Sequence, residues 1–197
     1  MRPFLVALLA GALALTATTA DAQKPMRVRG TITAFDSNVL SVKSRDGANL
    51  SIELTEKASV AAAKAITLAD LKQGSYVGAT TRKRADGALV ALEVHTLPPT
   101  VPPGHIPWDL EPGSMMTNAH IESSVQSAEG QELTLVYNDS SQKILVPPGT
   151  PIVTTVAADR SYLKPGEYVF IAAQAEDGGK ITALRIQVSH DGVKPPQ

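Results

Sequence analysis

The stretch LKQGSYV at residues 71–77 recurs as LKPGEYV at residues 163–169, and this recurrence is the first indication of how the chain is organised. The first copy begins at residue 71 and the second at residue 163, an offset of 92. Two further blocks match at the same offset: ALEV (91–94) with ALRI (183–186), and IEL (52–54) with ILV (144–146). One offset shared by separated blocks is the mark of a duplicated structural unit. The chain therefore contains one unit twice.

The first unit has the pattern of a small β-barrel. Apolar residues alternate or cluster in five short runs separated by turn residues such as Asp46-Gly47 and Asp86-Gly87: 28–35, 39–44, 49–54, 75–82 and 89–95. Such runs, bounded by Asp, Asn and Gly, are typical of antiparallel strands joined by hairpins. The alanine-rich segment 58–71 between the third and fourth runs predicts a short helical turn capped by Thr67. Five strands with a helix after the third is the order of an OB-type barrel.

The second unit repeats this order. Its expected strands are 120–126, 132–137, 142–146, 167–174 and 180–188, with a turn near 159–163. We therefore predict an all-β protein with two OB-like barrels in tandem, each folded from its own half of the chain. The expected organisation is a first module at 23–97, a Pro-rich docked connector at 98–118, a second module at 119–190 and a tail at 191–197.

Each unit resembles a bacterial domain of unknown function, DUF5666, found in exported proteins. The resemblance rests on Gly30-Thr31-Ile32, on the two Asp-Gly turns, and on the LKQG motif at 71–74 before a strand. The second unit departs from the pattern, because Ala119 replaces the glycine and Pro147-Pro148 interrupts the middle. The resemblance implies a fold and export, and it implies no activity.

Residues 1–22 have the layout of a secretory signal peptide. Arg2 precedes an apolar run at 4–15, and Ala20-Asp21-Ala22 forms a small-x-small cleavage site before Gln23. An uncleaved membrane anchor is the alternative, but a spanning helix needs about 20 apolar residues. We expect a periplasmic protein with no membrane anchor after cleavage.

Composition narrows the functional classes. The chain has 18 Lys plus Arg against 19 Asp plus Glu, a net charge of -1, so a nucleic-acid partner is not expected. With 0 cysteines, thiol chemistry and thiolate metal sites are excluded. Aromatic residues make up only 4% of the chain, so the cores are expected to consist of Val, Ile, Leu and Ala.

The connector carries the candidate partner-binding residues. Ile106, Trp108 and Leu110 alternate, so an extended chain would place all three on one side. We expect this side to pack on a barrel or in the seam between barrels, with Trp108, the sole tryptophan, largely buried.

The same region holds candidate metal ligands, His105, Met115 and His120. Imidazole and thioether ligands together suit copper. Their spacing is irregular and matches no known ligand motif, and the alternative is that the methionine packs in the seam while the histidines lie at the surface. We predict no cofactor and no tight metal site.

Catalytic motifs are missing from the sequence. Gly-x-Ser-x-Gly, His-Glu-x-x-His and phosphate-binding loops do not occur. The leading hypothesis is a non-enzymatic periplasmic binding or scaffold protein for a protein, peptide or envelope component. A copper-type accessory protein is the alternative. An envelope hydrolase is a third class, which requires a cleft with paired acid and base groups.

Overall fold

The regular structure is built from twelve strands and two single-turn 3₁₀ segments in a computed structural model that describes residues 24–176 and 178–196. The strands are β1 (Lys24–Asp36), β2 (Val39–Ser44), β3 (Asn49–Ala65), β4 (Tyr76–Lys83), β5 (Leu89–Thr96), β6 (Gly104–Pro107), β7 (Met115–Ser127), β8 (Gly130–Tyr137), β9 (Ser140–Val146), β10 (Ile152–Ala158), β11 (Tyr168–Ala175) and β12 (Ile181–Val188). The 3₁₀ turns are Leu68–Asp70 and Arg160–Tyr162. Within the described ranges, none of the helical segments has the length and apolar character needed to cross a membrane. The predicted all-β class is confirmed.

The strands close into two five-stranded barrels. Barrel A has the cyclic order β1-β2-β3-β12-β11, and barrel B has the order β7-β8-β9-β5-β4. In each barrel one pair is parallel, β3 with β12 and β5 with β9, and the other pairs are antiparallel. Closure leaves few free sheet edges, which suits such small modules.

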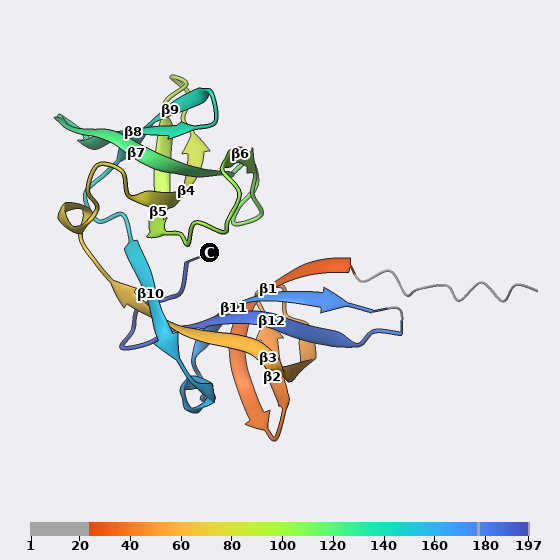
Figure 1. The fold of residues 1–197 in the computed structure, drawn as a ribbon. Coiled ribbons are helices and arrows are strands. Elements are labelled where there is room, and N and C mark those ends of the chain that lie inside the picture. The colour runs from red at the N-terminus through yellow and green to blue at the C-terminus, as the bar shows by residue number, and fades with distance from the viewer. Residues whose placement is uncertain (1–23, 177, 197) are drawn as a thin grey trace, which may run out of the picture.

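The two barrels exchange strands, and this corrects the tandem arrangement expected from the sequence. Barrel A combines β1 to β3 of the first repeat with β11 and β12 of the second, so in Figure 1 it joins the red and blue ends of the colour scale. Barrel B combines β4 and β5 with β7 to β9, from the middle of the chain. A boundary near residue 97 therefore separates the repeats and does not separate the barrels.

The exchange has its physical origin in β3. This strand continues for 17 residues through the alanine-rich segment that was expected to form a helical turn. Its second half pairs with β10, and Val60 lies opposite Ala158. Because the chain stays extended to Ala65, only Leu68–Asp70 forms a turn, which Asp70 caps by accepting from the Thr67 backbone N–H at 2.8 Å. The chain thus leaves barrel A and delivers β4 to barrel B.

The parallel strand pairs of the two barrels are related by the offset of 92 found in the sequence. Ile52 lies opposite Ile181 in barrel A, and Ile144 lies opposite Leu89 in barrel B. Each residue of the second pair is 92 positions from its counterpart in the first. The repeats are therefore related by a pseudo-twofold exchange of their last two strands.

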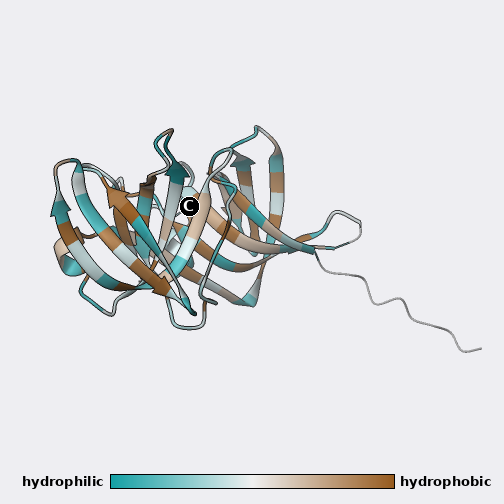
Figure 2. Cartoon of the chain, turned by 90° about the horizontal axis from the view of Figure 1, so that it is seen from above, coloured by the Kyte–Doolittle hydropathy of each residue, from teal (hydrophilic) through white to brown (hydrophobic). Residues whose placement is uncertain are grey.

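Each barrel has its own aliphatic core. Inward-facing residues alternate with polar ones along the strands, which Figure 2 shows as brown and teal bands. The core of barrel A includes Ile32, Leu40, Ile52, Ile171 and Ile186, and that of barrel B includes Val77, Val94, Leu133, Leu135 and Ile144. Every buried member of both clusters is Val, Ile, Leu or Ala, as composition predicted. Both cores draw on both repeats.

Candidate functional site

A cleft of about 420 Å³ lies between the two barrels. Strands β3 and β10 run past it from one barrel to the other, and the C-terminal end of the chain lies there (Figure 1). Barrel B lines it with His95, Met116 and Asn118, and barrel A lines it with Phe170, Arg185 and Gln187. These residues lie on the outer faces of the barrels, because their neighbours Val94 and Ile186 fill the cores.

The two walls are equivalent in the repeat but differ in chemistry. The offset of 92 relates Glu93 to Arg185 and His95 to Gln187. At these positions barrel B has a carboxylate and an imidazole, of which the imidazole lines the cleft, and barrel A has a guanidinium and an amide, which both line it. Two walls of different chemistry are complementary to an asymmetric ligand, and they are not complementary to a ligand with two identical halves.

The wall of barrel B contains a buried acid and base. The side chains of Glu93 and His95 are each 8% exposed, and His95 Nδ1 lies 3.6 Å from Glu93 Oε1. Thr80 Oγ1 donates to the same carboxylate oxygen at 3.1 Å. Within residues 24–176 and 178–196, His95 Nδ1 is buried without a hydrogen-bond partner. The imidazole lies over Gly78, where an added Cβ would stand 2.5 Å from Nε2.

Barrel A contains a buried cation next to the cleft residue Phe170. Arg29 is 4% exposed, and its Nη2 donates to Asp109 Oδ1 at 2.9 Å. Its guanidinium carbon lies 4.9 Å from the ring centroid of Phe170, its partner across the β1–β11 ladder. Arg29 Nε is buried and finds no hydrogen-bond partner in the described part of the chain. Arg29 thereby joins the connector to the barrel.

The connector docks on barrel A mainly through cations. The guanidinium carbon of Arg27 lies 4.3 Å from the centroid of the Trp108 ring, which also lines the cleft. Arg45 Nη1 donates to the Leu110 carbonyl at 2.9 Å, and Arg45 Nη2 donates to the Asp109 carbonyl. Stacking of arginine on an aromatic face and charge-assisted hydrogen bonds both favour this geometry.

The predicted apolar face of the connector is wrong in its details. Trp108 and Leu110 are only partly buried, and Ile106 is 43% exposed. The reason is that β6 ends at Pro107 and the chain turns, so the alternation does not continue to Leu110. Trp108 lies in the cleft between the barrels, but the side chains of Ile106, Trp108 and Leu110 do not pack together on one face.

We expect docking of the connector to weaken in acid. Burial acts to raise the pKa of Asp109, but the hydrogen bond and charge of Arg29 outweigh it, so this pKa lies below its usual range. The contribution of a carboxylate with a lowered pKa is present above its unfolded-state pKa of about 3.9, and is lost as the pH falls through the folded-state value. Trp108 emission should therefore change in acid before the far-ultraviolet dichroism does. In Asp109→Asn this early change should be missing, and an identical change in that variant would contradict the assignment.

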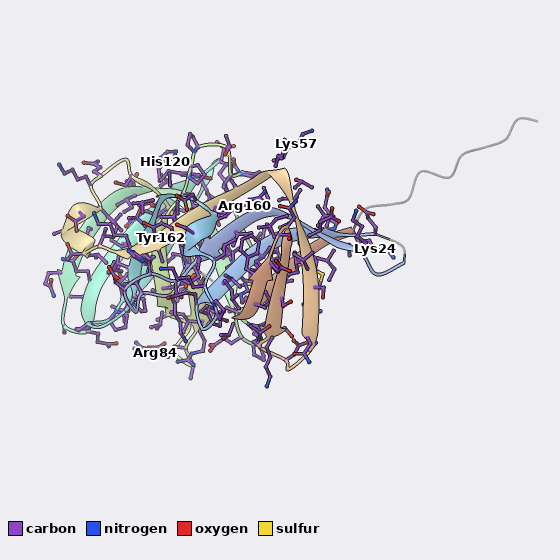
Figure 3. All side chains as sticks on the ribbon, turned by 90° about the horizontal axis from the view of Figure 1, so that it is seen from below. Lys24, Lys57, Arg84, His120, Arg160 and Tyr162 are labelled. Atoms are coloured by element: carbon purple, nitrogen blue, oxygen red, sulfur yellow. The ribbon has the colours of Figure 1, made fainter. Side chains whose placement is uncertain are left out.

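The structure does not bring the three metal-ligand candidates together. His105 lies opposite Thr117 in the β6–β7 ladder, so it shares a side of the sheet with Met115, whereas His120 falls on the other side. His105 Nδ1 lies 2.8 Å from Thr117 Oγ1, and His120, at the periphery in Figure 3, has its Nδ1 3.0 Å from the Gly74 carbonyl. No group of three or more His, Cys, Asp or Glu placed to hold a metal occurs among the residues that the structure describes.

Sequence reasoning singled out Trp108 but missed the residues of the barrels that line the cleft. Glu93 and His95 lie on the outward face of a strand, which in a single barrel would face solvent. The repeat offset did contain a signal, because Glu93 and Arg185 differ in charge at equivalent positions. That signal gains meaning only once the barrels are known to face each other.

The comparisons with known proteins match one repeat. Residues 29–95 match the family model described as Domain of unknown function (DUF5666). No curated protein and no solved structure matches the chain. The matched segment runs from β1 to β5, so the family unit contributes three strands to barrel A and two to barrel B. As the sequence predicted, the segment from Arg29 to His95 resembles DUF5666 domains.

Proposed function

We propose that this chain is an exported, non-enzymatic binding protein that holds a segment of a partner in the cleft between its barrels. The observation that carries the proposal is the cleft itself, which both barrels and the connector line together. Its volume of about 420 Å³ falls within the range of about 300–1,000 Å³ typical of ligand sites. The export part of the proposal rests on residues 1–22, which lie outside the described residues.

Unpaired polar groups at the cleft support a binding role. A buried polar atom without a partner costs about 1–3 kcal/mol, so such atoms call for an explanation where they occur. His95 Nδ1 is one such atom within the described ranges. The side chains of Arg185 and Gln187 also make no hydrogen bond or ion pair within residues 24–176 and 178–196. A ligand with acceptor groups would satisfy the donors of Arg185 and Gln187, which line the cleft.

The buried pair of Glu93 and His95, of which His95 lines the cleft, does not by itself favour hydrolysis. Nucleophilic catalysis of this type needs a hydroxyl or thiol that is hydrogen-bonded to an imidazole, and the imidazole activates that nucleophile by accepting its proton. In the described part of the chain, no side chain hydrogen-bonds to the His95 ring. Binding without catalysis is therefore the simpler role for this pair.

Site-specific photo-crosslinking tests the proposal. A photoreactive benzoylphenylalanine placed at Gln187, in the cleft, should form covalent adducts with a partner in cells that produce the protein. The same residue placed at Val125 serves as the control, because Val125 is 59% exposed and lies towards the other end of β7 from the cleft residues Met116 and Asn118. Adducts should appear from Gln187 and not from Val125. Equal adducts from both positions, or none from Gln187, would contradict a cleft-based function.

A further inference from the structure

The chain folds its own tail back towards the cleft. After β12, His190 and Val193 exchange backbone hydrogen bonds of 3.1 and 2.9 Å across a two-residue turn. Asp191 and Gly192 both have positive φ, at 47° and 77°. Positive φ at both central positions is what a type I′ reversal requires, and Asp-Gly is a favoured sequence for it. The turn thus sends residues 193–196 back along the molecule.

The tail places two prolines between the barrels. Pro195 and Pro196 are both buried, and Pro196 lines the same cleft as Trp108 and Phe170. Lys194, which precedes them, is exposed and holds its ammonium 5.1 Å from the centroid of the Tyr168 ring. In Figure 1 the C-terminal end lies in the space between barrel A and barrel B. A proline pair therefore occupies part of the site that the proposed function assigns to a partner.

The chemistry of the cleft suits such a segment. Proline-rich segments bind in aromatic-lined grooves because their extended conformation is already formed and little entropy is lost on binding. Trp108 and Phe170 provide the aromatic surface here. Proline has no backbone N–H, so a proline-rich segment offers carbonyl acceptors without matching donors. Arg185 and Gln187 are donors in the cleft that the short tail leaves unpaired within the described residues and that a longer partner segment would satisfy.

We propose that the cleft binds an extended, proline-rich peptide segment of a partner, and that residues 194–196 occupy the same site when the partner is absent. This inference rests on the proposed function and names its ligand class. The tail is then an internal competitor. A tethered segment has an effective concentration in the millimolar range, so a tail whose own dissociation constant for the site is about 100 µM should weaken the binding of an external peptide by about tenfold.

A peptide made from the tail itself tests the inference. The chain is shortened to end at Val193, which keeps the Asp191-Gly192 turn and removes only the segment that would compete. The probe is the synthetic peptide GVKPPQ, which has the sequence of residues 192–197. Trp108 emission should shift along a saturating curve as the peptide is added to the shortened chain, and the full chain should need about ten times more peptide. A peptide with alanine in place of both prolines, GVKAAQ, should not saturate over the same range.

A second variant guards against a folding defect in the shortened chain. Pro195→Ala/Pro196→Ala keeps the whole backbone and should bind GVKPPQ as tightly as the shortened chain does. Val125→Ala, a substitution at an exposed residue remote from the cleft, is the matched control, and it should behave like the full chain. Failure of GVKPPQ to bind both the double variant and a cooperatively folded shortened chain would overturn the inference, as would equal binding of GVKAAQ. Adducts from Gln187 with a partner segment that lacks proline would also overturn it, while leaving the proposed function standing.

Discussion

Neither half of the chain is expected to fold alone. Residues 24–99 contain β1 to β5, which supply three strands of barrel A and two of barrel B. Separated from residues 100–197, this half loses Ile171 and Ile186 from the core of barrel A and leaves β1 and β3 without their second neighbours. Each fragment should lack a cooperative thermal transition by circular dichroism, and an equimolar mixture should recover it.

Cooperative unfolding of an isolated fragment would contradict this expectation. A fragment that unfolds cooperatively near the melting temperature of the whole chain must close β4 and β5 onto its own first three strands. That behaviour would support two tandem barrels and would remove the structural basis for the exchange. Gel filtration of the mixture adds an independent readout, because the reassembled pair should elute at the position of the intact protein.

Gly30→Ala is expected to cause a large loss of stability, because Gly30 is buried on the inward-facing side of β1, between the core residues Val28 and Ile32. An added Cβ would lie 2.3 Å from the Lys43 carbonyl oxygen and 2.8 Å from the Ser44 Cα, so β1 or β2 would have to move. Overpacking against rigid neighbours costs about 1–3 kcal/mol and occasionally more. We expect the upper end, about 3 kcal/mol, which corresponds to a melting temperature lower by about 10 °C in a chain of this size.

Gly78→Ala is the matched control for this prediction. Its Cβ would also make a short contact, at 2.5 Å, but the atom contacted is Nε2 of the His95 side chain, which can rotate. The loss of unfolding free energy, measured by urea denaturation, should therefore be clearly smaller than in Gly30→Ala. If the two variants lose equal stability, or if Gly30→Ala stays within about 0.5 kcal/mol of the parent, the close approach of β1 and β2 is wrong.

Local patterns predicted the strands and left their partners undetermined. The duplication, the strand order, the aliphatic cores and the resemblance of the first repeat to DUF5666 domains all follow from residue spacing and turn chemistry. The partner of β1 does not, because β4 and β11 begin with the closely similar segments at 76–77 and 168–169. Either strand fits the same inward-facing pattern. The choice depends on the segment 58–65, whose alanines suit both a helical turn and the extended strand that forms.

The cleft was beyond sequence reasoning for a related reason. Glu93 and His95 lie on the outer face of β5, where Thr80 of the same barrel contacts Glu93 and the cleft between the barrels covers His95. Proximity along the chain was also misleading for His105 and His120, because the β6–β7 ladder directs them to opposite sides. Trp108 stands out in the sequence because it is the sole tryptophan. Its contact with Arg27 was not predictable, because the two residues are 81 positions apart in the chain.

Disulfide trapping tests the exchange of strands most directly, because the chain has 0 cysteines of its own. Thr31 lies opposite Tyr168 in the β1–β11 ladder, and in a tandem arrangement the offset of 92 would place Tyr76 there instead. Facing residues on neighbouring strands have Cα separations of about 4.5–5.5 Å, which a disulfide spans. We expect Thr31→Cys/Tyr168→Cys to form an intramolecular disulfide on mild oxidation, seen by intact mass and peptide mapping, and Thr31→Cys/Tyr76→Cys not to form one. Efficient crosslinking of the second variant and not of the first would contradict the exchange of strands.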